Sequence, residues 1–160
     1  MGLGRKIVGG LAAGGIAIFA GTSATEDKTT RDQAGAITEA GGLGAFAVRI
    51  GDCLQLPDGT QVVSVEGVPC AEPHDGQVYA EFAVSPAPSF PGDAAMQSQS
   101  EQGCIDRWPA AFGVTYENDA AHELYYMSPS AESWATDDRE VTCVVTTADG
   151  SPLVGSKLAG

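Results

Sequence analysis

The chain has 160 residues, of which 43% are hydrophobic and 18% charged, a balance typical of a globular protein rather than a disordered one. Its formal net charge of −13 at pH 7 argues against a surface that attracts phosphate backbones, so we expect no nucleic-acid partner. The 21 glycines and 9 prolines favour many turns and short strands over a helical bundle.

An apolar run from Ile7 to Gly21 follows two basic residues, Arg5 and Lys6. A short positive segment before an apolar stretch is typical of an export signal, because the positive end stays in the cytoplasm. We therefore predict that residues 1–24 form a signal peptide or a transmembrane anchor. The rest of the chain is then expected at the cell membrane, on its extracytoplasmic side. The small residues that end at Ala24 resemble a cleavage site, and cleavage would make the protein secreted; we favour an uncleaved anchor.

Residues 25–48 combine glycines with charges of both signs and lack an apolar face of any length. This composition predicts a flexible linker, with transient helix around residues 29–40. The folded domain is then expected over residues 49–160.

Four cysteines, Cys53, Cys70, Cys104 and Cys143, all lie beyond the export segment. An even number in an exported chain indicates disulfides, and four cysteines allow three pairings. The pattern favours Cys53 with Cys70, which would close a hairpin-sized loop between neighbouring strands, and Cys104 with Cys143, which would join a helix to a strand. A zinc site would need closely spaced cysteine pairs, which the sequence lacks, so we expect no metal and no other cofactor.

One long helix is expected in the second half of the chain. Asp93 follows a Pro-Gly pair and is a candidate N-cap. Apolar residues at helical spacing, among them Cys104 and Trp108, predict a face that packs on a sheet. Pro109 lies inside this pattern and should kink or end the helix, because proline lacks the N–H that a helix interior needs.

Strands are predicted from several segments, beginning with the short extended pieces at Cys53 and over residues 62–70. Residues 77–84 alternate between polar and apolar side chains, and strands are also expected over 123–127 and 140–147. The Asp149-Gly150 pair predicts a hairpin turn after the last of them, with a return through Leu153. The predicted fold class is α+β, a mainly antiparallel sheet with one principal helix packed on a face.

Several short motifs occur in order along the chain: Gly51-Asp52-Cys53, Val68-Pro69-Cys70-Ala71-Glu72-Pro73-His74-Asp75, Pro91-Gly92-Asp93, Ser133-Trp134 and Val141-Thr142-Cys143. Together they resemble the septum-formation-related domain of actinobacterial envelope proteins, over residues 50 to 160. The resemblance implies a link to cell division, and it implies no reaction.

Few residues are candidates for chemistry. His74 and Asp75 could supply a base and an acid, but no nucleophile motif such as G-x-S-x-G is present, so a turn beside Cys70 is the favoured interpretation. Asp137-Asp138 is expected to be a solvated turn, because no calcium-loop pattern surrounds it. Trp134 is a candidate for contact with a partner, since aromatic side chains dominate interface energetics. We thus predict no catalytic residue, and His74, Asp75 and Trp134 remain as candidate binding residues.

These observations predict a membrane-tethered, extracytoplasmic interaction domain that is not an enzyme. Its expected partner is an envelope or division protein, and the N-terminal segment is expected to contact the membrane. The alternative is an envelope-polymer hydrolase or a metal-dependent enzyme that uses His74 and Asp75.

Overall fold

The computed structural model describes residues 11–13, 26–59 and 62–158. It contains a seven-stranded sheet with the order β1-β8-β9-β7-β5-β6-β4 and a separate two-stranded sheet of β2 and β3. The elements are β1 (Leu11–Ala13), β2 (Thr30–Arg31), β3 (Ile37–Glu39), β4 (Gly41–Gly44), η2 (Ala45–Ala47), β5 (Cys53–Gln55), β6 (Ser64–Val68), β7 (Gly76–Ala83), α1 (Asp93–Phe112), η3 (Tyr116–Asn118), β8 (His122–Pro129), α2 (Ala131–Trp134) and β9 (Glu140–Thr147). The predicted α+β class, a mainly antiparallel sheet with one principal helix, is confirmed.

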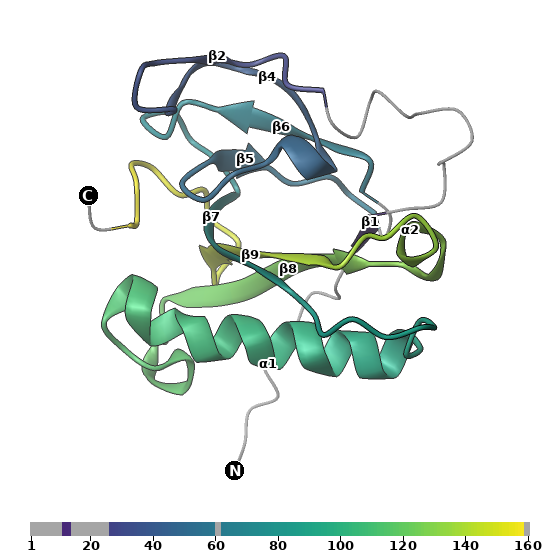
Figure 1. Ribbon diagram of the computed structural model, residues 1–160. Helices are drawn as coiled ribbons and strands as arrows, with labels where there is room; N and C mark the ends of the chain where they lie inside the picture. The colour runs from purple at the N-terminus through teal and green to yellow at the C-terminus, as the bar shows by residue number, and fades with distance from the viewer. Residues whose placement is uncertain (1–10, 14–25, 60–61, 159–160) are drawn as a thin grey trace.

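Strands β8, β9 and β7 form the middle layer of the molecule (Figure 1). Helix α1 lies along one face of this layer, and β5, β6 and β4 lie on the opposite side. Strand β9 pairs antiparallel with β7, where Ala83 lies opposite Glu140, and with β8, where Met127 lies opposite Thr142. Strands β7 and β8 therefore run in the same direction, and their C-terminal ends lie at the same end of the sheet.

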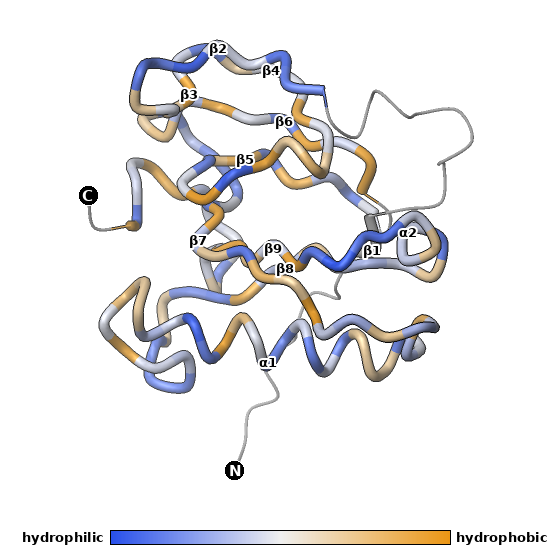
Figure 2. The backbone as a smooth tube through the Cα atoms, viewed as in Figure 1, coloured by the Kyte–Doolittle hydropathy of each residue, from blue (hydrophilic) through white to orange (hydrophobic). Residues whose placement is uncertain are grey.

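Both faces of the middle layer are buried, and the protein has two hydrophobic cores as a result. Successive side chains of a strand point to opposite faces. Val78 and Val144 lie in the core on the side of β5 and β6, whereas Tyr79 and Val145 lie in the core beneath α1. Along α1, hydrophobic and hydrophilic residues alternate from turn to turn (Figure 2), and Trp108 on its inner face is fully buried. The predicted apolar face of this helix is thus confirmed.

The two disulfides join the pairs of cysteines that the sequence favours. Cys53 at the start of β5 bonds to Cys70 just after β6, with the Cα atoms 5.2 Å apart. Cys104 in α1 bonds to Cys143 in β9, with the Cα atoms 5.6 Å apart. The second bond fastens the helix to the middle of the sheet, at a point where both residues are completely buried.

The ends of α1 differ from the expected ones. The N-cap is Gly92, and Asp93 is the first helical residue. The positive end of the helix dipole stabilises the negative charge of Asp93 at this position. Pro109 does not end the helix, which continues to Phe112 before Gly113 adopts a left-handed conformation with φ 70°. The missing N–H of Pro109 costs one hydrogen bond, but the burial of the neighbouring Trp108 holds this last turn in place.

The predicted flexible linker is also wrong, because the described part of residues 25–48 folds as β2, β3, β4 and η2. Ile37 and Leu43 enter the core on the side of β5 and β6. Gly67 on β6 leaves room for these two side chains, because a Cβ there would lie 2.6 Å from a methyl of Leu43 and 2.7 Å from one of Ile37. Arg31 fastens this segment to the domain, as its Nη1 and Nη2 donate to Asp52 over 2.6 and 2.9 Å.

The chain after β9 also differs from the prediction. Gly150 forms the expected turn, with φ 75°, but the returning segment does not pair with β9. Leu153 instead forms an isolated antiparallel bridge with His74. The C-terminal segment therefore crosses to the end of the sheet where β7 begins.

The predicted export segment, residues 1–24, lies outside the described residues except for β1. Leu11–Ala13 pairs in parallel with β8, with Leu11 opposite Met127. In the part of the chain that the structure describes, no helix has the length and apolar character needed to span a membrane.

Candidate functional site

His74 and Asp75 stand just before β7, and both are used to fasten neighbouring segments. His74 is completely buried, its backbone forms two hydrogen bonds with Leu153, and its Nδ1 lies 2.8 Å from the carbonyl oxygen of Glu72. The Asp75 carboxylate accepts the backbone N–H of Leu56 over 2.9 Å. This arrangement matches a turn that is stabilised by polar side chains. A buried imidazole of this kind is closed to a polymeric substrate.

Trp134, the third candidate binding residue, lies in α2 at the other end of the sheet. It is 5% exposed and packs edge-on against Phe90, with ring centroids 5.9 Å apart. The guanidinium of Arg139 also stacks on this indole, 3.6 Å from the ring centroid. Because His74 precedes β7 and α2 follows β8, the structure does not bring the three candidates together.

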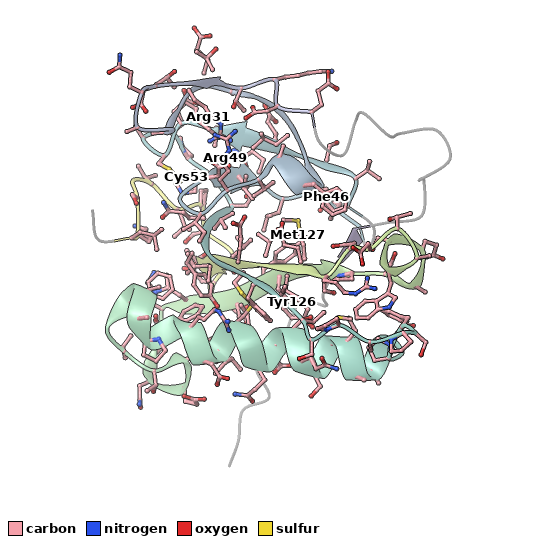
Figure 3. The ribbon with its side chains drawn as sticks, in the orientation of Figure 1. Arg31, Phe46, Arg49, Cys53, Tyr126 and Met127 are labelled. Atoms are coloured by element: carbon pink, nitrogen blue, oxygen red, sulfur yellow. A yellow bond between two sulfur atoms is a disulfide. The ribbon has the colours of Figure 1, made fainter. Side chains whose placement is uncertain are left out.

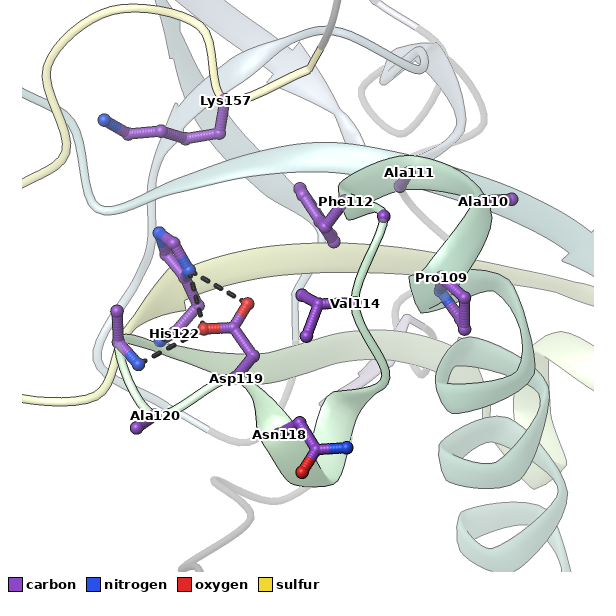
Figure 4. A pocket seen from close by; sticks show the side chains of 12 residues that line it. Pro109, Ala110, Ala111, Phe112, Val114, Asn118, Asp119, Ala120, His122 and Lys157 are labelled. Carbon is purple, nitrogen blue, oxygen red and sulfur yellow. Dashed lines mark hydrogen bonds and ion pairs between the residues drawn. The ribbon is translucent and has the colours of Figure 1, made fainter.

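A shallow depression of about 790 Å³ lies beside the C-terminal end of α1 (Figure 4). It is lined by residues 109–114 and 118–122 and by Lys157. At its edge, the Nδ1 of His122 lies 3.0 Å from the Oδ1 of Asp119. An aspartate three residues before a histidine in a turn is a weak signal in sequence, and our sequence analysis did not select this pair.

The Asp119 carboxylate joins α1 to the start of β8. It accepts hydrogen bonds from the indole N–H of Trp108 and from the backbone N–H groups of Ala121 and His122. Burial opposes its ionisation, but the bonds from His122 and the backbone outweigh burial and hold the pKa of Asp119 below its ordinary value. None of the described residues that line the depression carries a hydroxyl or thiol for nucleophilic chemistry. The geometry therefore indicates a structural link.

A second depression, of about 430 Å³, lies between η2 and the turn that joins α2 to β9. Phe46, Ala83 and residues 136–140 line it. Phe46 is 43% exposed and extends over the space between η2 and the middle layer (Figure 3). Three of the lining side chains are acidic, namely Asp137, Asp138 and Glu140, against the single cation of Arg139. We call this space the acidic depression.

The two neighbouring aspartates of the acidic depression differ sharply. The side chain of Asp137 is 96% exposed, as predicted for a solvated turn, whereas Asp138 is 9% exposed, which corrects that prediction. The Oδ1 of Asp138 accepts the backbone N–H of Glu140 over 3.0 Å, its Oδ2 is buried, and the Ser133 hydroxyl also interacts with this carboxylate. Asp137 has φ 71°, and this left-handed residue turns the chain so that Asp138 points inward.

The carboxylates around this depression outnumber the nearby cations, and the pKa values of three of them are raised. Burial raises the pKa of Asp138, against a smaller opposing effect of the Ser133 hydroxyl. Burial and the charge of Asp138 raise the pKa of Glu140. Glu81, which precedes Ala83 on β7, has a pKa of about 7 because of burial and then repulsion from Glu140 and Asp52.

Arg139 does not balance these charges fully. Its Nη1 donates to the backbone oxygens of Trp134 and Asp138, over 2.9 and 2.6 Å, and its guanidinium is stacked on the indole. Its closest carboxylate contact is with the exposed Asp137, at 3.5 Å. The cation is thus fixed by backbone and ring contacts. Across residues 11–13, 26–59 and 62–158, no group of three or more His, Cys, Asp or Glu side chains is arranged to hold a metal ion.

Comparison with known proteins gives one finding. A family model described as septum formation matches residues 50–157, which is more than half of the chain. No curated protein and no solved structure matches the chain significantly.

Proposed function

This chain belongs to the septum formation family, and we propose that it acts in cell division as a membrane-tethered, extracytoplasmic interaction domain. Family membership supports the division-related role. The proposed extracytoplasmic location is supported by the cysteines, because all four are paired in disulfides and three of them are completely buried. Such bonds persist in oxidising compartments and are rare in the cytosol, where thiols are kept reduced.

We further propose that the domain works by binding an envelope or division protein and not by catalysis. His74 and Asp75 are engaged in a turn, and Asp119 and His122 connect two elements of the fold. The acidic depression, in contrast, exposes the Asp137 carboxylate and the Phe46 ring to solvent. Aromatic and charged side chains in a partly open depression favour recognition of a ligand. The hydrolase alternative gains no support from a fully buried His74.

The compartment is tested in cells by trapping thiols with a maleimide–polyethylene glycol reagent. We expect no shift in electrophoretic mobility without reduction and four additions after reduction under denaturing conditions. A Cys104→Ser/Cys143→Ser variant serves as the control, with two additions after reduction. Protease added to intact spheroplasts should digest the domain. Free thiols in unreduced samples, or protection from protease until the cells are lysed, would overturn the proposed compartment.

The interaction is tested by photocrosslinking. A photoreactive amino acid replaces Phe46 beside the acidic depression or, as a control, Val154, which is 57% exposed and lies near the opposite end of the sheet. We expect one envelope or division protein to be captured from position 46 in dividing cells and not from position 154. Identical patterns from both positions would refute a specific partner at this surface.

A further inference from the structure

We propose that the outer edge of β8, at Met127, Ser128 and Pro129, is an acceptor site for an extended apolar segment of another protein, which adds to the sheet as a parallel strand. We call this site the β8 edge. The inference deepens the proposed interaction function by naming a surface and the chemistry of its partner, and it rests on the proposed membrane tether. The β8 edge lies at the end of the sheet that also carries Ala83 of the acidic depression.

The β8 edge already holds a strand in the structure. Strand β1 lies beside β8, near α2 (Figure 1), and pairs with it in parallel, with Ala12 opposite Ser128 and Ala13 opposite Pro129. The pairing of β8 with β9 ends one residue earlier, at Met127. Ser128 and Pro129 therefore have β1 as their strand partner in the described part of the chain.

The direction of the backbone groups explains why this edge takes up a strand. In an antiparallel pair, residues that bond to the neighbouring strand alternate with residues whose N–H and C=O point away from it. Ala121, just before β8, accepts the N–H of Ala148 over 3.0 Å, so the odd-numbered residues of β8 are the ones that bond to β9. The N–H and C=O of Ser128 therefore point toward β1, and an extended segment is the ligand that suits such groups.

The segment that fills the β8 edge is also part of the segment that we expect to enter the membrane. Leu11–Ala13 lies in the apolar run from Ile7 to Gly21. A chain inside a bilayer must satisfy its backbone groups there, so it cannot pair with β8 at the same time. The tethered protein thus uncovers an edge whose residues are buried when β1 is present, with Met127 3% and Ser128 6% exposed. Uncovered edges of this kind pair readily with other chains.

The opposite edge of the seven-stranded sheet does not share this property. Strand β4 is covered by the chain just before β2, where Asp27 forms an antiparallel bridge with Leu43. The N–H of Gly44 also donates to the carbonyl oxygen of Glu26 over 2.7 Å. These covering residues follow the apolar run in the sequence and stay with the domain when the run leaves. Of the two edges, the edge of β8 is therefore the one that opens.

The sequence that occupies the β8 edge indicates the chemistry of the partner. Residues 9–15 read Gly-Gly-Leu-Ala-Ala-Gly-Gly, with no charge and a single large side chain. In strand addition, backbone hydrogen bonds supply affinity and the side chains that fit the edge supply specificity. Pro129 has no N–H and ends the ladder, which limits the site to a short segment. We therefore expect an extended, uncharged partner segment that is rich in glycine and alanine.

The site is tested with a fluorescent peptide, Lys-Lys-Gly-Gly-Leu-Ala-Ala-Gly-Gly-Lys-Lys, whose binding to the purified full chain is followed by anisotropy. The matched control peptide is N-methylated at its leucine and both alanines, which removes backbone donors and keeps the charge. In a full-chain Leu11→Pro/Ala12→Pro variant, β1 loses the N–H groups that pair with β8. We expect this variant to bind the peptide about tenfold or more tightly than the wild type in solution does, because its own strand no longer competes. The N-methylated peptide should bind to neither protein.

Wild type in phosphatidylcholine nanodiscs separates the acceptor site from the membrane tether. We expect the disc-bound wild type to bind the peptide as tightly as the double-proline variant does, since the bilayer holds the apolar run away from β8. Empty discs serve as the blank. Tight binding by the variant together with weak binding by the wild type mixed with discs would support the acceptor site and refute the membrane tether of the proposed function.

Two substitutions, made in the double-proline variant, connect binding with the edge. Ser128→Pro removes the N–H that points toward β1 and should weaken binding by about tenfold or more, whereas Ser128→Ala keeps it and should leave binding unchanged. The ¹⁵N–¹H NMR spectrum reports the folding of each variant, and the shifts that the peptide causes should centre on residues 126–128. Equal binding of the two peptides, or full affinity in a folded Ser128→Pro variant, would overturn the proposal. Self-association of the double-proline variant through β8 would also overturn it, because a second copy would then be the occupant.

Discussion

Replacement of Glu81 by glutamine should stabilise the protein at pH 8 and change its stability much less at pH 5. Glu81 has a pKa of about 7 in the folded protein because of burial, followed by repulsion from Glu140 and Asp52, against an ordinary value of 4.5. The folded state therefore binds the proton more tightly than the unfolded state does. The penalty is absent below pH 4.5, grows as the pH rises, and is complete above pH 7.

The size of this effect follows from the same pKa values. Each pKa unit corresponds to 1.36 kcal/mol, so the full difference would be about 3.4 kcal/mol for a group shielded from solvent. Glu81 is only half-buried, and solvent screening reduces the expected gain in the free energy of unfolding to roughly 1–2 kcal/mol at pH 8. Glutamine keeps the shape of the side chain, so the difference isolates the charge.

The assay is urea unfolding at pH 5 and pH 8, followed by tryptophan fluorescence, since Trp108 and Trp134 are both buried. Glu66→Gln is the matched control, because Glu66 is an exposed glutamate on β6 and its replacement should change stability little at either pH. If Glu81→Gln shifts stability equally at both pH values, or lowers it at pH 8, the reasoning is refuted.

Three further predictions concern the covalent and packed parts of the fold. Loss of the helix–sheet disulfide in a Cys104→Ala/Cys143→Ala variant should lower the free energy of unfolding by about 4 kcal/mol, from the entropy of a loop that spans 39 residues, as measured by urea unfolding. Arg31→Ala should lower the free energy of unfolding by about 3–5 kcal/mol, because Asp52 is 4% exposed and would be left as an unpaired buried charge. A variant as stable as the wild type in urea unfolding would contradict the attachment of residues 26–49 to the domain. Gly103→Ala should lower the free energy of unfolding by about 1–3 kcal/mol and the melting temperature with it, because the added Cβ would collide with the ring of Phe82 on β7. An unchanged melting temperature would show that this ring can move aside.

Patterns that are local in the sequence predicted the fold well. The β-branched run around Cys143 and the helical spacing around Cys104 were sufficient to place the two residues on a strand and a helix. The disulfide pairing followed from those elements and is confirmed. Pro109 was harder, because the tertiary burial of Trp108 maintains a helical turn that the local rule would end.

Long-range packing explains what the sequence analysis missed. The glycines between residues 35 and 44 resemble those of a flexible linker, and only the folded structure shows that a Cβ on Gly41 would collide with the backbone of Lys28 and one on Gly67 with the side chains of Leu43 and Ile37. The acidic depression is similar in this respect. Asp137 and Asp138 are chemically identical neighbours, and their opposite exposure depends on one backbone angle that no spacing rule reveals.

The boundary of the folded unit lies upstream of the boundary that the family match marks. The match begins at residue 50, and Asp52 lies within it, but the two nitrogens that neutralise Asp52 belong to Arg31. Strand β4 also covers the edge of β6, where Leu43 pairs with Val65. A chain that began at residue 50 would leave a buried carboxylate without its cation and a hydrophobic core open along one strand. Residues 26–49 are therefore part of the structural domain.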